Sequence, residues 1–190
     1  NDPNLQNIPI RSELGNSIRR SFVAAPKHLL LSLEYSQIEL RILAHLSHDT
    51  RLIEHYKAGV DINTATAAAV HDIPIDIVTK EQRRDAKAIN FGLLYGLSAH
   101  RLAINLNIDY KTAQLFIERY FATFSKVKSY MQSVKEQATK DGFYTTLFGR
   151  RRDFPELNSN VWAIRQAGER MVMNFPMQGT QADMLKMAMI

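Results

Sequence analysis

Four side chains at intervals of four residues form a group that could bind a phosphorylated ligand: Arg83, Lys87, Phe91 and Tyr95. Because an α-helix advances by about 400° over four residues, these positions would form one slowly drifting stripe on its surface. The two cations could hold phosphate oxygens near the start of the helix, where the helix dipole also favours negative charge. The two rings could stack on a sugar or a base. One helix face could therefore bind both the phosphates and the sugar or base of a nucleotide.

The residues around this stripe predict the helix that it requires. Thr79 and Gln82 have the spacing of a capping box, and Gly96 is a natural stop after a helix of residues 80–95. An alternative interpretation makes the two rings core residues and the two cations a solvated edge. The spacing alone leaves both interpretations open.

The remaining patterns predict an α+β fold in which helices predominate. Residues 27–33 form a short apolar run typical of a buried strand, and a helix is expected directly after it, over residues 36–46. Pro176 indicates a break between the last two helices. Further helices are expected from Asp61 onward and over residues 110–124, 126–140, 161–172 and 178–190, and a β-hairpin over residues 143–155.

Composition limits the kind of protein and its partners. The chain has 190 residues, 45% of them hydrophobic, and a net charge of +5, which favours polyanionic partners such as nucleic acid. Cysteine is absent, so disulfides and thiolate metal sites are excluded. No apolar run approaches the roughly 20 residues of a membrane span, and the start lacks a signal-peptide pattern. We expect a cytoplasmic protein with no membrane partner.

Four segments resemble bacterial family A DNA polymerases, in the family's order and spacing. Residues 83–96 (RRDAKAINFGLLYG) resemble the nucleotide-binding helix, and residues 34–41 (EYSQIELR) resemble the first catalytic motif, at the end of a palm strand. Residues 2–9 (DPNLQNIP) and 173–180 (MNFPMQGT) are similar to two further segments. The resemblance covers the whole chain and implies an internal fragment of a polymerase domain.

The resemblance implies a right-hand architecture and a reaction. Residues 1–60 would be the first part of the palm, residues 61–158 the fingers, and residues 159–190 a return to the palm. The implied enzyme is a monomeric bacterial polymerase of replication and repair that adds deoxynucleoside triphosphates to the primer 3′ end of primer-template DNA. It would use two Mg²⁺ ions for phosphoryl transfer.

The resemblance also implies roles for nucleotide-binding residues. Arg83 and Lys87 would hold the triphosphate, with Lys87 also catalytic, while Phe91 would pack on the sugar and base, and Tyr95 would sit at the template position. A phenyl ring at Phe91 resembles relatives that discriminate against dideoxynucleotides. Three further implied nucleotide contacts are Gln37, Glu39, which would crowd the sugar 2′ position or be a plain surface charge, and Asn63, where relatives usually have histidine.

Other residues would contact DNA. Arg84 would lie near the primer end. Amide donors on Asn174 and Gln178 could reach minor-groove acceptors that every base pair offers, which tests pairing geometry without reading sequence. The alternative is that both satisfy local backbone groups. Weaker candidates for DNA contact are Gln6, Asn7 and Arg152, the last within Arg150–Arg152, which could equally be a solvated basic turn.

The metal site departs from the family pattern. Glu34 and the backbone carbonyl of Tyr35 are the expected ligands, but the family carries aspartate where this chain has Glu34. The extra methylene moves the carboxylate by about 1 Å, and such a misplacement can cost about 10²-fold in rate. The family's second carboxylate motif, His-Asp-Glu, is missing and is expected to follow Ile190. The isolated chain is therefore expected to be inactive.

Two other functions remain as alternatives. One is a catalytically impaired polymerase relative that only binds DNA, which the replacement at Glu34 would fit. The other is a metal phosphohydrolase using His45, His48 and Asp49, although a His-Asp dipeptide is common by chance.

Overall fold

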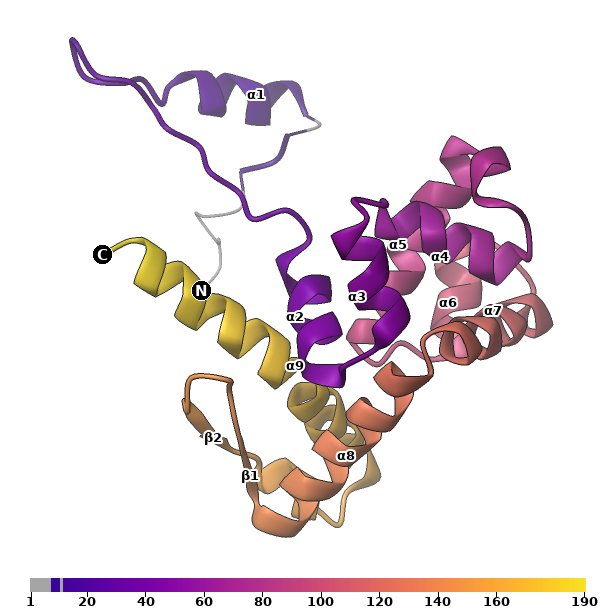
Figure 1. Ribbon diagram of the computed structural model, residues 1–190. Coiled ribbons are helices and arrows are strands. Elements are labelled where there is room, and N and C mark those ends of the chain that lie inside the picture. The colour runs from indigo at the N-terminus through magenta and orange to yellow at the C-terminus, as the bar shows by residue number, and fades with distance from the viewer. Residues whose placement is uncertain (1–7, 11) are drawn as a thin grey trace. The chain divides into compact units, whose positions relative to one another are not determined.

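The structure is a computed structural model that describes residues 8–10 and 12–190, so Gln6 and Asn7 lie outside the described residues. The chain divides into two compact units, with the boundary after Ser36. The elements, labelled in Figure 1, are α1 Glu13–Arg20, α2 Ile38–Ser47, α3 Thr50–Lys57, α4 Ile62–His71, η1 Ile75–Ile77, α5 Lys80–Leu94, α6 Ala99–Leu106, α7 Tyr110–Thr123, α8 Ser125–Asp141, β1 Phe143–Thr145, β2 Arg151–Asp153, η2 Pro155–Asn158 and α9 Trp162–Ala188. The helix-rich fold is thus confirmed, and the palm and fingers boundaries stay predictions.

In the described residues of the first unit the one helix is α1, which the sequence patterns did not predict. The Ser12 side chain caps it by accepting a hydrogen bond from the Gly15 backbone N–H. The strand expected over residues 27–33 is wrong: the segment is irregular, and Leu29 and Leu31 are 94% and 81% exposed. A strand needs a neighbour for its backbone groups, and in the described part of the chain the only pairing joins β1 to β2.

The second unit is built from helices around a large apolar core. In this core α4 packs against α5 and α7, while α2 packs against α8 and α9 (Figure 1). The fully buried side chains include Leu40 of α2, Ile62 of α4, Ile89 of α5 and Tyr120 of α7. Burial of one face of each helix against the others holds α5 in a fixed position.

The predicted β-hairpin is confirmed, and it packs on α9. β1 and β2 are antiparallel, with Tyr144 opposite Arg152. Just beyond β1, the Thr146 hydroxyl donates a hydrogen bond of 2.8 Å to Asp183 of α9. A Cβ atom at Gly179 would lie 2.5 Å from the Thr146 Cγ2 atom. The missing side chain at Gly179 therefore permits the hairpin to approach the helix closely.

The break predicted at Pro176 is wrong, because α9 is one continuous helix that contains this proline. Pro176 has no N–H to donate to the carbonyl of Val172, a loss that costs about 3 kcal/mol in an ordinary helix interior. Burial offsets that cost, since Val172 and Met177 are 0% exposed and Pro176 is itself buried. As a result Asn174 and Gln178 lie one turn apart on the same helix.

Candidate functional site

The helix α5 forms as its capping residues predict. The Thr79 hydroxyl accepts a hydrogen bond from the Gln82 backbone N–H at 3.2 Å, and the Gln82 side chain accepts one from the Thr79 N–H at 2.9 Å. Gly96 follows the helix with a φ of +70°, a left-handed conformation that glycine adopts without strain. The capping box and the stop are both confirmed.

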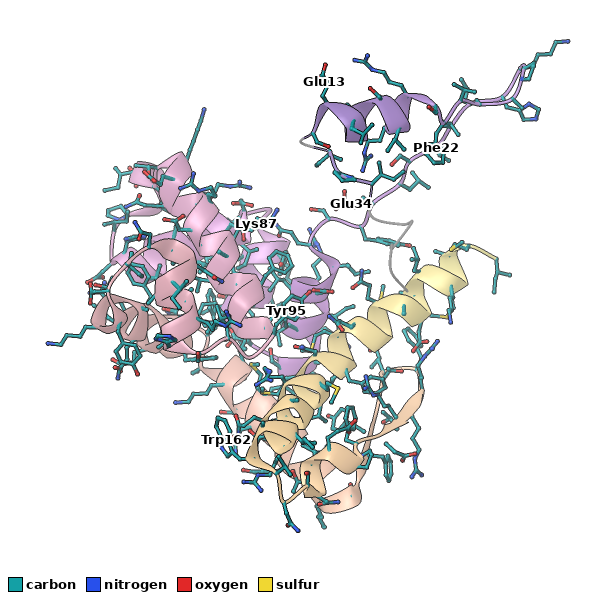
Figure 2. The ribbon with its side chains drawn as sticks, turned by 180° about the vertical axis from the view of Figure 1, so that it is seen from behind. Glu13, Phe22, Glu34, Lys87, Tyr95 and Trp162 are labelled. Carbon is teal, nitrogen blue, oxygen red and sulfur yellow. The ribbon has the colours of Figure 1, made fainter. Side chains whose placement is uncertain are left out.

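The stripe on α5 combines two exposed cations with two half-buried rings. Arg83 and Lys87 are exposed, whereas Phe91 and Tyr95 pack against the edge of the core. The two ring centroids are 6.4 Å apart, with the planes tilted by 37°. Figure 2 labels Lys87 and Tyr95 along this helix. Lys87 makes no ion pair with any residue that the structure describes.

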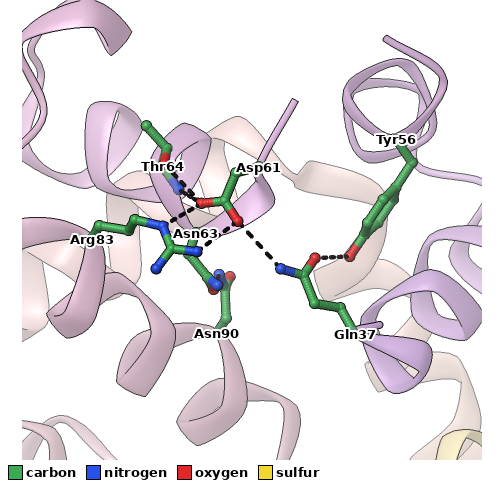
Figure 3. A network of polar contacts seen from close by, with 7 residues as sticks. All are labelled: Gln37, Tyr56, Asp61, Asn63, Thr64, Arg83 and Asn90. Atoms are coloured by element: carbon green, nitrogen blue, oxygen red, sulfur yellow. Dashed lines mark hydrogen bonds and ion pairs between the residues drawn. The ribbon is translucent and has the colours of Figure 1, made fainter. Parts of the chain in front are cut away.

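Arg83, in contrast, is paired with Asp61, the residue that caps α4 (Figure 3). Its Nε and Nη2 atoms lie 2.8 and 3.1 Å from the two carboxylate oxygens. The same carboxylate accepts hydrogen bonds from the Thr64 backbone N–H and hydroxyl at 2.9 and 2.7 Å. Burial alone would raise the pKa of Asp61, but the hydrogen bonds from Arg83 and Thr64 and the charge of Arg83 lower it to about 2.

Gln37 and Asn63 occupy different parts of this network (Figure 3). The Gln37 amide donates to Asp61 at 3.3 Å, and its carbonyl oxygen accepts from the Tyr56 hydroxyl at 3.4 Å. Asn63 is only 3% exposed, and its side-chain oxygen accepts from the Asn90 amide at 3.0 Å. Gln37 thus belongs to the polar network around Arg83, while Asn63 is turned into the interior between α4 and α5.

Tyr95 joins residues from three helices. Its hydroxyl donates a 2.5 Å hydrogen bond to Glu39 of α2. Burial, followed by the hydrogen bond and charge of Glu39, raises the pKa of Tyr95 to about 12, and a hydrogen bond from Gln178 of α9 lowers it in part. Glu39 is therefore engaged and is no isolated surface charge. One turn before Gln178, the buried side-chain oxygen of Asn174 has no hydrogen-bond partner among the described residues.

The predicted DNA-contacting arginines are exposed and already have partners. Arg84 pairs with Glu81 at 3.1 Å on the surface of α5. The Arg152 guanidinium lies 5.0 Å from the ring centroid of Phe154. Its neighbour Arg150 is paired with Asp183, so the basic turn is not simply solvated.

The expected metal ligands lie in the other unit of the chain. Glu34 and Tyr35 belong to the first unit, where both are exposed. In the described ranges no three His, Cys, Asp or Glu side chains are grouped so that they could hold a metal ion. Asp49 has a structural role instead: it is 3% exposed, and it caps α3 through the Leu52 N–H at 3.1 Å. The phosphohydrolase alternative loses this ligand.

Asp61, like Tyr56, belongs to this network although no sequence pattern identified it as a site residue. Its spacing from Thr64 is a recognisable helix start, and this signal locates the cap. The ion pair with Arg83 joins residues 22 positions apart, so no local pattern shows it.

Among the helices of the described residues, none has both the length and the apolar content of a membrane span.

The fold has a close match among solved structures. The POL domain of Pol1 from M. smegmatis, in complex with DNA primer-template and dNTP, superimposes with a TM-score of 0.89 and 47% sequence identity. The match covers 98% of this chain and 33% of that one. At this level of similarity the chain shares the fold of part of a polymerase domain.

Sequence relatives agree with the fold. The profile of DNA polymerase family A matches residues 1–190, and the chain belongs to that family. It is 52% identical over 189 residues to the thermostable DNA polymerase I of Thermus aquaticus, and 51% identical over 189 residues to DNA polymerase I of Pseudomonas aeruginosa. Both matches cover 100% of this chain, which spans 23% and 21% of the two relatives.

Proposed function

We propose that this chain is part of a template-directed DNA polymerase that adds deoxynucleoside triphosphates to a primer 3′ end. The observation that carries the proposal is the stripe on α5, where Lys87, with no ion pair among residues 8–10 and 12–190, lies between Arg83 and two half-buried rings. The solved relative with the same fold is a complex with primer-template and dNTP, which supports both partners.

The residues of the stripe would bind different parts of one nucleotide. Lys87 and Arg83 would hold triphosphate oxygens, while the exposed face of Phe91 would pack on the sugar and base. Glu39 would crowd the sugar 2′ position. Its carboxylate accepts a hydrogen bond from the Tyr95 hydroxyl, whose raised pKa keeps it protonated and able to donate at neutral pH.

DNA would be held mainly through contacts that do not read its sequence. Gln178 and Asn174 would donate to minor-groove acceptors, and the unpartnered buried oxygen of Asn174 would then need a donor from the ligand or from solvent. Arg84 and Arg152 would contact phosphates, which adds affinity but no sequence preference. We assign Gln6 and Asn7 the same kind of contact from the family resemblance alone.

Polymerases of this type are expected to use two Mg²⁺ ions, which stabilise negative charge on the triphosphate when they are bound. The Glu34 carboxylate and the Tyr35 carbonyl would supply oxygen ligands of the kind that Mg²⁺ prefers. One carboxylate does not make a site for two ions, and the described residues contain no larger group of ligands. We therefore assign Glu34 as one ligand and expect the isolated 190-residue chain to lack activity.

The test of nucleotide binding is the substitution Lys87→Ala. A hydrogen bond to a charged group contributes about 1.5–3 kcal/mol, so the dissociation constant of a deoxynucleoside triphosphate should rise by roughly 10- to 100-fold. Isothermal titration calorimetry measures this change. Lys140→Ala is the control, because Lys140 is an exposed lysine on α8, away from the stripe. Equal affinities for the two variants would rule out this function for α5.

Glutamate at position 34, where the family carries aspartate, favours a second candidate function: a polymerase relative that binds DNA without catalysis. The substitution Glu34→Asp, made in the full-length protein, separates the two. A gain in nucleotide incorporation supports the enzyme, because the shorter side chain restores the family's ligand position. No gain over an inactive parent protein supports the binding role.

A further inference from the structure

Arg83 and Lys87 lie on one stripe of α5, but only Arg83 already contacts an acidic side chain. Lys87 is without an ion pair among the described residues, whereas the Nε and Nη2 atoms of Arg83 are bonded to Asp61, at 2.8 and 3.1 Å. A planar guanidinium binds carboxylate and phosphate oxygens with the same fork geometry. The Asp61 carboxylate therefore occupies one of the edges through which Arg83 could bind a phosphate group in a bidentate manner.

We propose that Asp61 competes with the triphosphate for the Nε–Nη2 edge of Arg83, so that a phosphate binds this edge only by displacing the carboxylate. This inference rests on the proposed function, since it assumes that α5 binds a triphosphate. It makes Asp61 a residue that sets affinity, and it makes Lys87 the first cation available to the ligand.

The other contacts of Asp61 keep the free-energy cost of this exchange low. Without Arg83, its carboxylate would still accept hydrogen bonds from the Thr64 N–H and hydroxyl and from the Gln37 amide. Figure 3 shows Gln37 on the opposite side of the carboxylate from Arg83, and Thr64 beside the oxygen that Arg83 Nε contacts. No oxygen of Asp61 would be left buried without a donor, which is the large cost of breaking most buried pairs.

The same contacts keep Asp61 in place during the exchange. It caps the first turn of α4 through Thr64, so its carboxylate cannot follow Arg83 towards a ligand. Its negative charge would remain near the bound phosphates and weaken their binding. Protonation does not remove that charge near neutral pH, because the pKa of Asp61 is about 2.

The ion pair is weak enough to be displaced. The Arg83 side chain is 49% exposed and the Asp61 side chain is 32% exposed, so solvent screens their attraction. Pairs of this kind contribute little, and removing one corresponds to about a two- to five-fold change in a binding constant.

The substitution Asp61→Asn removes the charge and keeps a side chain that caps helices well. Asp109→Asn is a matched control. Asp109 caps α7 in the same way, accepting hydrogen bonds from the Thr112 N–H at 3.0 Å and hydroxyl at 2.5 Å, but it pairs with no arginine among the described residues. Both substitutions change the net charge of the chain by the same amount.

The experiment measures the dissociation constant of inorganic tripolyphosphate by calorimetry at low salt. We expect Asp61→Asn to bind about two- to five-fold more tightly than the parent chain, and Asp109→Asn to bind like the parent. In an Arg83→Gln background, Asp61→Asn should bring a clearly smaller gain, because the competition acts through Arg83.

The other outcomes are distinct. If the parent binds tripolyphosphate and Asp61→Asn binds it no more tightly, Asp61 does not compete and the proposed function stands. If neither protein binds tripolyphosphate, both the triphosphate site on α5 and the proposed competition by Asp61 are refuted. Should Asp61→Asn lose its thermal transition, Asp61→Ser is the second variant, since serine also caps a helix without charge, and the same gain is required of it.

Discussion

The Asp61 carboxylate accepts hydrogen bonds from α4 and α5 at once, and this predicts a pH dependence. Its pKa in the folded chain is about 2, below the usual value of about 3.9. A lowered pKa contributes stability that is present above about pH 4 and is lost as the pH falls towards 2. The contribution should stay under about 1 kcal/mol, because the pair with Arg83 is partly exposed.

The substitution Asp61→Asn should therefore flatten the dependence of the urea midpoint on pH between about pH 4 and pH 2. The comparison variant is Asp76→Asn in η1, where an exposed carboxylate accepts no hydrogen bond from a described residue. Identical curves for the two variants would contradict the role of Asp61.

For single residues, the sequence predicts the relations between side chains that lie on the same helix. A spacing of four residues was enough to identify the stripe from Arg83 to Tyr95, because one helix sets their relation. The bond between Glu39 and Tyr95 joins positions 56 apart, and the chain brings them together only through packing of α2 against the rest of the core. Spacing gives no information about such a contact.

The helices α4 and α5 are joined by a buried polar contact as well as by apolar packing. Asn90 accepts from the Thr66 hydroxyl and donates to Asn63, each at 3.0 Å, and all three side chains are at most 3% exposed. Asn90→Ala should destabilise the chain by about 2–4 kcal/mol, because two buried partners lose their hydrogen bonds. Urea unfolding measures this, and Asn105→Ala, at an exposed helical position, should stay within about 0.5 kcal/mol.

The contact between the hairpin and α9 depends on Gly179. Gly179→Ala would place a methyl group 2.5 Å from Thr146 Cγ2, and we expect a loss of about 1–3 kcal/mol in the free energy of unfolding. Thr146→Ser removes that methyl and keeps the hydroxyl that donates to Asp183. The double variant should therefore be more stable than the two separate losses predict, by at least about 0.5 kcal/mol. Strict additivity would show that the methyl contact is not the cause.

The predictions of elements succeeded where the determinants are local and failed where packing decides. Thr79 and Gln82 cap α5 by themselves, so the start of this helix was predictable. Pro176 is a helix breaker in isolation, yet burial around it keeps α9 continuous. The apolar run of residues 27–33 has a strand composition, but strand formation also requires a partner, which a run of residues does not specify.

The whole chain consists of two units, and the larger one contains both apolar core clusters. A chain that begins at Gln37 should therefore fold by itself. Its thermal midpoint, followed by circular dichroism, should lie within about 4 °C of the value for the full chain, a difference that corresponds to about 1 kcal/mol at this size. A broad or absent transition would show that residues before Gln37 are needed for the core to form.

Asp49 links two positions that are distant in sequence. One of its oxygens accepts from the Leu52 N–H, and the other accepts at 3.1 Å from the N–H of Lys126, 77 residues later. The carboxylate thus holds together the two ends of the segment between them, which includes α5 and also contacts α2 and α9 through Tyr95. The entropy of closing such a loop grows only with the logarithm of its length. Insertions in the loops of this segment should therefore cost little stability, provided that its ends stay joined at Asp49 and its helices keep their contacts with α2 and α9.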